Sequence, residues 1–267
     1  EIRAKAKPIQ FILAHKRDAD ALVLAQFIDR QIAGDARQIS ARLFDLAAWI
    51  AAGASGWLLS KSAIAPPLAP IVRTKGYVIA AAAGAIIGAY LVGSSLSLFS
   101  SSGALSHSVA GALAGAILAV EGYKLARGER RSTGGAFVAP FVVGLVIGRW
   151  GCHFAGLADG TYGVPTTLPW GVDLGDGIAR HPVALYESGA MALFLVAYLA
   201  SLRRRAAWTL VHGFHVMAAF YGAQRFIWEF LKPYPKLVGP FNLFHVVSLG
   251  LVVYGVGSII LARRNRA

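Results

Sequence analysis

Seven stretches of mostly apolar residues run along the chain, and shorter polar or glycine-rich segments separate them. A helix that crosses the hydrocarbon core of a bilayer needs roughly 17–25 such residues. The pattern therefore predicts transmembrane helices at Leu43–Ser60, Tyr77–Phe99, Leu105–Leu125, Phe137–Leu157, Pro182–Leu202, Val211–Leu231 and Phe241–Ala262. Glycine pairs four residues apart let helix backbones approach closely in lipid, and they occur at Gly84 and Gly88, Gly111 and Gly115, and Gly144 and Gly148. The predicted fold class is an all-α, polytopic membrane protein of about seven transmembrane helices.

Residues 1–42 differ from the rest of the chain, because they hold eight Lys or Arg residues and five acidic residues. Apolar side chains recur there at helical spacing, which predicts a short amphipathic helix with an apolar face of Leu24, Phe27, Ile28 and Ile32. Such a helix lies in the plane of the membrane surface. We therefore divide the chain into an N-terminal amphipathic segment, 1–42, and a transmembrane helical bundle, 43–267.

The composition supports a membrane protein over a nucleic-acid-binding protein. A net charge of +13 on a polar chain would suggest a nucleic-acid partner. This chain is 56% hydrophobic and only 15% charged, with a mean hydropathy of +0.57. The surplus charge is then typical of the basic loops of a multi-span membrane protein. We expect a lipid bilayer and no nucleic acid as partner, and the single cysteine excludes an intramolecular disulfide.

The basic residues between the predicted spans gather on one side of the membrane. Thirteen lie on that side, namely Lys61, Arg73, Lys75, Lys124, Arg127, Arg130, Arg131, Arg203, Arg204, Arg205, Arg263, Arg264 and Arg266. The opposite side has three, Arg180, Lys232 and Lys236, when residues 1–42 are left out. Cytoplasmic loops carry the excess of basic residues. The rule predicts a cytoplasmic C-terminus, and with seven spans it places the basic segment 1–42 outside, which runs against the same rule.

Ionisable and other polar residues gather at the outer ends of five predicted spans. Counting spans along the chain brings together His107, Arg149, His153, Arg180, His181, Arg225, Glu229, Asn242 and His245. A charged side chain at the middle of a membrane helix costs about 2.5–3.5 kcal/mol on insertion scales, so such residues are usually functional. We therefore predict a polar site at the outer face of the bundle.

The two arginines among these residues suggest the chemistry of a ligand. A guanidinium is a planar fork that matches the oxygens of a phosphate, so Arg149 and Arg225 favour an anionic lipid headgroup. His107 beside them is a candidate base, because histidine titrates near neutral pH; alone, it would be interpreted as a core histidine. Two structural interpretations remain open. Arg225 and Glu229 are four residues apart and could neutralise each other, and Arg149 could extend towards the membrane interface.

Other polar residues give weaker signals. Arg180 and His181 precede Pro182, which suits the first position of a helix, so this corner is either a binding element or a structural one. Asp173 and Asp176 have no further ligands nearby in sequence, and we expect no metal site. Neighbours on a helix point apart, so Cys152 and His153 do not suggest a nucleophile pair.

Four motifs in order carry a resemblance to a known family. They are Gly148-Arg149-Trp150-Gly151, Pro169-Trp170-Gly171-Val172, Arg180-His181-Pro182-Val183-Ala184-Leu185-Tyr186-Glu187 and Tyr221-Gly222-Ala223-Gln224-Arg225-Phe226-Ile227-Trp228-Glu229-Phe230. Together they resemble the bacterial prolipoprotein diacylglyceryl transferase family over about 106–262, a little over half of the chain. Each piece alone would be a weak signal, whereas the ordered set is specific.

The resemblance implies a multi-pass enzyme of the bacterial inner (plasma) membrane whose site faces the outer leaflet. Such an enzyme moves a diacylglyceryl group from phosphatidylglycerol to the lipobox cysteine thiol in the signal peptide of a prolipoprotein, and glycerol phosphate leaves. The implied partners are phosphatidylglycerol, the signal peptide and the bilayer. No metal and no organic cofactor is implied.

The resemblance also implies roles for particular residues. The catalytic residues would be His107, Arg149, Arg225 and Glu229. The substrate-binding residues would be Arg149, Arg225, Tyr221, Arg180, His181 and Gly151. The arginines would hold the phosphate and stabilise its departing charge, and His107 would help to take the proton of the acceptor thiol.

The sequence also departs from the family pattern. It has Ser108, Cys152, Leu157 and Lys232 where the family has Gly, Asn, Glu and Arg. These departures leave room for a divergent member that acts on another lipid or acceptor. A membrane transporter of an anionic substrate and a non-catalytic scaffold with the same fold are two further hypotheses for this sequence.

Overall fold

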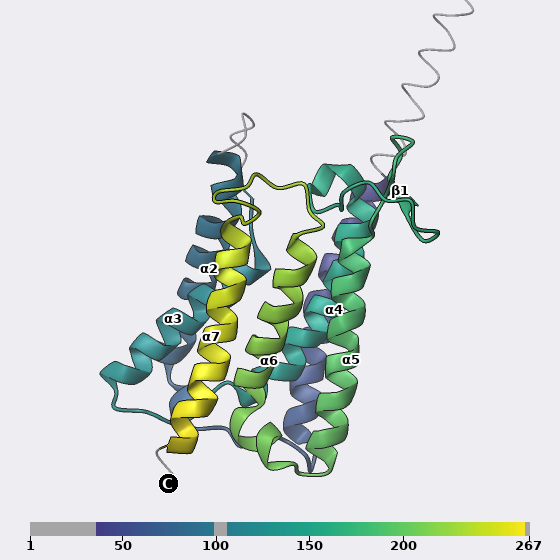
Figure 1. Ribbon diagram of the computed structural model, residues 1–267. Helices are drawn as coiled ribbons and strands as arrows, with labels where there is room; N and C mark the ends of the chain where they lie inside the picture. The colour runs from purple at the N-terminus through teal and green to yellow at the C-terminus, as the bar shows by residue number, and fades with distance from the viewer. Residues whose placement is uncertain (1–35, 99–105, 265–267) are drawn as a thin grey trace, which may run out of the picture.

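A computed structural model describes residues 36–98 and 106–264, and over these ranges the chain forms a bundle of long helices (Figure 1). The helices are an N-terminal helix Ala36–Lys61, α2 (Lys75–Leu98), α3 (Val109–Ala126), α4 (Val138–Ala155), α5 (Val183–Arg203), α6 (Ala207–Glu229) and α7 (Leu243–Arg264). Short 3₁₀ turns lie at Pro70–Arg73, Gly135–Phe137 and Gly156–Asp159. The strands β1 (Val172–Asp173) and β2 (Ala179–Arg180) pair antiparallel as a small hairpin. The all-α prediction is confirmed.

Each of the seven predicted spans coincides with a helix. Six of the described helices are long and apolar enough to cross a membrane, and together they make the chain a multi-pass membrane protein. The helix at the predicted span Val211–Leu231 is α6, which is not one of those six. Its sequence is less apolar, because it holds His212 and His215 near its start and a buried polar stripe, described below, near its end. Figure 1 shows α6 between α7 and α4.

The N-terminal division of the chain stays a prediction. The amphipathic helix expected around Leu24–Ile32 lies outside the described residues. Residues 36–42, which we assigned to the surface segment, are continuous with the first membrane helix.

The two ends of the bundle differ in their loops and in their charge. We call the end with the loops 156–182 and 230–242 the hairpin end, because it carries β1 (Figure 1). The opposite, C-terminal end has the loops 62–74 and 127–134 and the end of α7. Twelve of the thirteen basic residues that predict the cytoplasmic side are described, and all lie in or next to the loops and helix ends of the C-terminal end.

Two helices that start at the hairpin end have polar caps. The Ser108 hydroxyl accepts a hydrogen bond from the Gly111 N–H at 3.2 Å, and α3 begins at the next residue. The Asn242 side-chain oxygen accepts from the His245 N–H at 3.2 Å at the start of α7. Because a cap residue has a non-helical backbone, each helix begins inside the apolar stretch that predicted it.

Helices α2 and α3 pack tightly through the glycines predicted to allow close approach. A Cβ atom on Gly88 would collide with the carbonyl oxygen of Gly111, and one on Gly84 would collide with that of Gly115. The two backbones therefore touch along two turns, as expected for small residues spaced four apart in a membrane. This contact holds the start of α3, and His107 before it, against α2.

We predict that Gly88→Leu destabilises the protein, because the new side chain meets backbone that cannot move aside. Overpacking of this kind costs about 1–3 kcal/mol, and the measurement is thermal unfolding in detergent. Gly122→Leu on α3 is the matched control, since no described atom lies within 4 Å of a Cβ at Gly122. Equal unfolding midpoints for the two variants would contradict the close packing of α2 on α3.

Candidate functional site

Five ionisable side chains meet inside the bundle near its hairpin end, and we call them the ion cluster. They are Arg149 on α4, Glu187 on α5, Arg225 and Glu229 on α6, and Lys232 just after α6. None is more than 7% exposed, and Glu187 and Glu229 are 0% exposed. Charged side chains are rarely buried to this degree unless they are paired. The arrangement of the pairs therefore decides what the cluster can do.

Glu187 is the centre of the ion cluster. Its Oε2 lies 2.7 Å from Nε of Arg149. Its Oε1 accepts hydrogen bonds from Nη1 of Arg225 and, at 2.9 Å, from Nζ of Lys232. One carboxylate thus holds three cations from two helices and the loop after α6, and it fixes where both guanidiniums lie.

Arg225 has a second carboxylate partner that ties α6 to α7. Its Nη2 lies 3.0 Å from Oε2 of Glu229, one turn further along α6. Oε1 of Glu229 accepts a hydrogen bond at 3.0 Å from the side-chain amide of Asn242, the cap of α7. The pairing of Arg225 with Glu229 that we considered as a structural interpretation is confirmed. The pair does not simply neutralise itself, however, because Arg225 also contacts a second carboxylate, that of Glu187.

The local sequence of α6 explains the polar stripe. Tyr221, Gln224, Arg225 and Trp228 follow the spacing i, i+3, i+4, i+7, so they share one face of the helix. The side-chain amide of Gln224, Nε of Arg225 and Nε1 of Trp228 are buried, and within 36–98 and 106–264 none of them has a hydrogen-bond partner. A buried donor without an acceptor is costly, so such groups need an explanation. This face of α6 therefore offers buried donors to a ligand that is rich in acceptors.

The ion cluster does not balance its own charge. Arg149, Arg225 and Lys232 carry three positive charges, and Glu187 and Glu229 carry two negative charges, which leaves +1. An uncompensated charge in a buried site is strongly unfavourable. A single negative charge on a ligand would complete the cluster.

Tyr221 lies between Arg149 of the ion cluster and Phe141, which lines a mostly apolar cavity. Its hydroxyl is buried against the Arg149 guanidinium, and its ring packs edge-on against Phe141 with 5.5 Å between ring centroids. Phe141 on α4 also lines a cavity of about 410 Å³ among α2, α3, α4, α6 and α7, whose other walls include Leu113, Ile117 and Phe214 with the polar Glu121 and His215. Cavities of this size with mostly apolar walls are typical of binding sites for small hydrophobic molecules.

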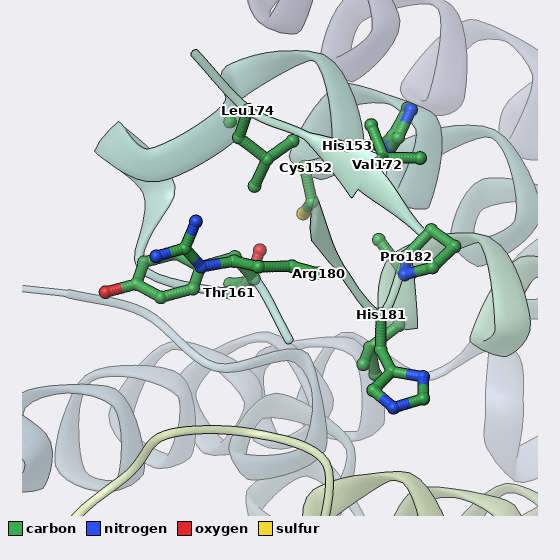
Figure 2. A pocket seen from close by; sticks show the side chains of 12 residues that line it. Cys152, His153, Thr161, Val172, Leu174, Arg180, His181 and Pro182 are labelled. Atoms are coloured by element: carbon green, nitrogen blue, oxygen red, sulfur yellow. The ribbon is translucent and has the colours of Figure 1, made fainter. Parts of the chain in front are cut away.

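A smaller pocket lies at the hairpin end, next to the ion cluster (Figure 2). Cys152 and His153 both line this pocket, and Figure 2 shows the Cys152 sulfur on the side that faces Arg180. The Cys152 sulfur lies 3.8 Å from Nη1 of Arg149, so it links the pocket to the ion cluster. Arg180 and His181 line the pocket and are not members of the ion cluster.

Arg180 and His181 are held by partners of their own. Nη1 of Arg180 lies 2.6 Å from Oδ1 of Asp176, and its guanidinium lies over the Tyr162 ring at 5.3 Å. The hydrogen bond from Arg180 holds the pKa of the Asp176 carboxyl below its ordinary value. Nδ1 of His181 lies 3.4 Å from the Tyr186 hydroxyl. These contacts favour the structural interpretation of the corner, and the binding role of both residues stays a prediction.

His107 and Gly151 are the two other residues predicted for the site. His107 is exposed at the hairpin end, two residues before α3, and it lies outside the ion cluster. Gly151 is buried against the N-terminal helix, where a Cβ would lie 3.2 Å from both the Ala41 oxygen and the Phe44 Cβ. Its missing side chain therefore has a packing explanation. The catalytic role of His107 and the binding role of Gly151 stay predictions.

Sequence reasoning missed two members of the ion cluster. Glu187 stands in one of the family motifs but was given no role, although a lone acid inside an apolar span is itself a functional signal. Lys232 was counted only among the basic residues of the loops opposite the cytoplasmic side, whereas it is 1% exposed and bound to Glu187. Its distance in sequence from that partner, 45 residues, hides the pair.

The described residues include no group of three or more His, Cys, Asp or Glu side chains arranged to hold a metal ion. The two acids of the ion cluster are paired with cationic side chains instead.

Comparisons with known proteins agree with the resemblance. A family model described as "Prolipoprotein diacylglyceryl transferase" matches residues 31–261. Three similar curated proteins are named phosphatidylglycerol–prolipoprotein diacylglyceryl transferase. The one from Finegoldia magna is 32% identical over 122 residues, 45% of this chain and 46% of the relative. Those from Geobacter sulfurreducens and Cupriavidus metallidurans are both 33% identical, over 132 and 139 residues, which cover 46% and 48% of this chain and 48% and 49% of the relatives.

The chain spans about half the length of the curated relatives it matches. No solved structure is significantly similar to it.

Proposed function

Because the chain belongs to the prolipoprotein diacylglyceryl transferase family, we propose that it transfers a diacylglyceryl group from phosphatidylglycerol to the cysteine thiol of a prolipoprotein. One observation carries the proposal: Arg149 and Arg225, on different helices, converge on the same carboxylate inside a buried cluster of net positive charge. Two guanidinium forks at one point suit a phosphate group. The headgroup of phosphatidylglycerol supplies the single negative charge that the cluster lacks.

The reaction forms one bond and breaks another. The thiolate sulfur of the acceptor attacks the glyceryl carbon that is esterified to phosphate, and a carbon–sulfur thioether forms. The bond between that carbon and the phosphate oxygen breaks, and its electron pair stays with the oxygen of the departing glycerol phosphate. The thiol proton passes to a base. Arg149 and Arg225 would stabilise the charge that grows on the phosphate, because fixed donors in a dry site act strongly there.

The apolar cavity supports a lipid as the donor. It lies beyond Tyr221 from the ion cluster, and Phe141 contributes to its wall. A phosphate held at the arginines would leave an acyl chain free to extend past Tyr221 into this space. A phosphorylated substrate without such a chain would leave the cavity unused.

We assign the role of base to His107. It stands at the hairpin end, where a peptide thiol from outside the membrane would arrive, and it is exposed. A general base must lie within hydrogen-bond reach of the proton in the productive complex, but this geometry often forms only when substrate binds. The acceptor cysteine would therefore dock near the start of α3.

We predict that His107→Gln lowers kcat by about 10²–10⁴-fold, the range for loss of a general base. The KM for phosphatidylglycerol should change little, because His107 is not in the ion cluster. Single-turnover transfer to a synthetic lipobox peptide measures the effect. His212→Gln is the control, since His212 lies near the start of α6, at the C-terminal end of the bundle and away from the ion cluster (Figure 1). An unchanged kcat in His107→Gln would remove this residue from the mechanism.

We place the hairpin end on the outer side of the bacterial inner membrane. The basic residues of the C-terminal end support this orientation, since cytoplasmic loops are enriched in Lys and Arg. The ion cluster would then face the outer leaflet.

The direct test is reconstitution of the purified chain in nanodiscs that contain phosphatidylglycerol, with a lipobox peptide as acceptor. The expected products are a peptide that gains one diacylglyceryl group, seen by mass spectrometry, and an equal amount of glycerol phosphate. A peptide with serine in place of the cysteine should stay unmodified. No product under conditions in which the Geobacter sulfurreducens relative is active would refute the proposed activity.

A further inference from the structure

Glu187 and Lys232 form an ion pair at the centre of the ion cluster. Nζ of Lys232 and Nη1 of Arg225 both bind Oε1 of Glu187, while Nε of Arg149 lies at Oε2. Both oxygens of the carboxylate are thus engaged by cations. Lys232 is nearly as buried as Glu187, at 1% against 0% exposed.

This geometry gives Glu187 two effects on a ligand. It fixes the two guanidiniums, so that their remaining N–H groups, including the buried Nε of Arg225, are held in place. It also cancels one of the three positive charges, and Glu229 cancels another. The two carboxylates cancel two of the three positive charges, so a net charge of +1 remains to attract the ligand. Removing Lys232 would lower this net charge, and removing Glu187 would raise it.

We infer that Glu187 and Lys232 are specificity-determining residues that set the site to a headgroup with one negative charge, a phosphodiester. This inference rests on the proposed function and deepens it. A phosphomonoester headgroup, which carries about −1.5 to −2 charges at neutral pH, exceeds the positive charge of the site. A zwitterionic headgroup has no net charge with which to balance the +1 charge of the ion cluster. Charge matching in a buried site decides which partner binds, because a mismatch leaves a desolvated charge without a counter-ion.

The two residues can be altered separately and together, which separates charge from structure. Glu187→Gln raises the net charge of the ion cluster to +2, and Lys232→Met lowers it to zero. The double variant Glu187→Gln with Lys232→Met returns the charge to +1 while removing the ion pair between the two residues. A merely structural role for these residues predicts that the double variant is at least as impaired as the worse single variant.

The experiment titrates phosphatidylglycerol or phosphatidic acid into the purified full chain in detergent and measures the bound lipid by native mass spectrometry. Lys232→Met should weaken binding of phosphatidylglycerol by about 30-fold or more, the effect of unbalancing a buried charge. The double variant should bind phosphatidylglycerol clearly more tightly than Lys232→Met does and should keep the wild-type preference for that lipid, although loss of the Glu187 charge loosens the two guanidiniums. Glu187→Gln should shift the preference towards phosphatidic acid.

Lys236→Met is the matched control, because Lys236 is exposed at the same end of the bundle and its loss changes the charge of the whole chain equally. It should bind both lipids as the wild type does. If Glu187→Gln does not fold, the wild type, Lys232→Met and the double variant still decide the question. A double variant that binds no better than Lys232→Met, or a preference that does not follow the charge, overturns the inference.

Transfer to the lipobox peptide is measured in parallel, so that the two proposals can fail separately. Binding that follows the charge series without any thioether product from the wild type would refute the proposed transfer and leave the charge matching intact. If the wild type transfers the group but the headgroup preference of the variants does not follow their net charge, the charge matching is refuted and the proposed transfer stands.

Discussion

Replacing Arg149 or Arg225 by glutamine should reduce kcat/KM by about 10²–10³-fold or more, the effect of removing one preorganised donor to a developing negative charge. Each arginine contacts Glu187 from a different helix, so neither can take the place of the other. Release of glycerol phosphate from phosphatidylglycerol, followed together with thioether formation, measures the loss. Both variants keep a polar side chain but shorten it and remove the charge and the planar fork.

The lysine variants sharpen the test. Arg149→Lys and Arg225→Lys keep the positive charge but lose the planar fork, which binds a phosphate with two parallel hydrogen bonds. We expect them to remain well below the wild type in kcat/KM. Arg264→Gln, at the end of α7 near the C-terminus, is the control and should be fully active. Turnover within a few-fold of the wild type in both glutamine variants would exclude the arginines from the mechanism.

The helices of this protein follow directly from its sequence, because each is a long apolar stretch bounded by polar residues. The offsets are small and have local causes. Span three was expected from Leu105, but α3 begins at Val109, since Ser108 caps it. The order of the spans alone also says which helix ends share a side of the membrane, which is why Arg149 and Arg225 were expected on the same side.

The partners inside the site could not be predicted in the same way. Glu187 lies 38 residues from Arg225 and 38 from Arg149, and nothing in a single sequence says that three helices turn these side chains towards one another. Helical spacing predicts contacts only three or four residues apart, which is why the Arg225–Glu229 pair was foreseen. Lys232 was missed because it follows the last turn of α6, where counting spans predicts a loop but does not predict burial.

The polar stripe of α6 bears both on the low hydropathy of this helix and on the candidate site. It makes this helix less apolar than the other six described helices, although it lies within the bundle. Helices that are hydrophobic on all faces can contact lipid, whereas one with buried polar groups must be enclosed by its neighbours. Part of what weakens the membrane signal of α6 is thus the set of polar residues that includes Arg225 and Glu229.

The ion pair between Arg225 and Glu229 should also contribute to stability, so that Glu229→Leu lowers the free energy of unfolding by about 3–5 kcal/mol, the cost of breaking a buried pair. Glu229 is 0% exposed, lies 3.0 Å from Nη2 of Arg225 and accepts the amide of Asn242, the cap of α7. Its loss leaves Arg225 with one carboxylate and frees the start of α7. Unfolding of the purified protein in detergent, followed by circular dichroism, measures the change.

The matched control is an Arg–acid pair with the same sequence spacing that lies outside the bundle. Asp176 pairs with Arg180 at 2.6 Å, also four residues apart, in the loop that carries the hairpin. Exposed pairs of this kind contribute little to stability, so Asp176→Leu should leave the unfolding midpoint nearly unchanged. If the two variants unfold alike, burial does not strengthen the Arg225–Glu229 pair, and the ion cluster would have to be regarded as accessible to water. Because the charge-matching inference requires a dry site, this comparison also tests its physical premise.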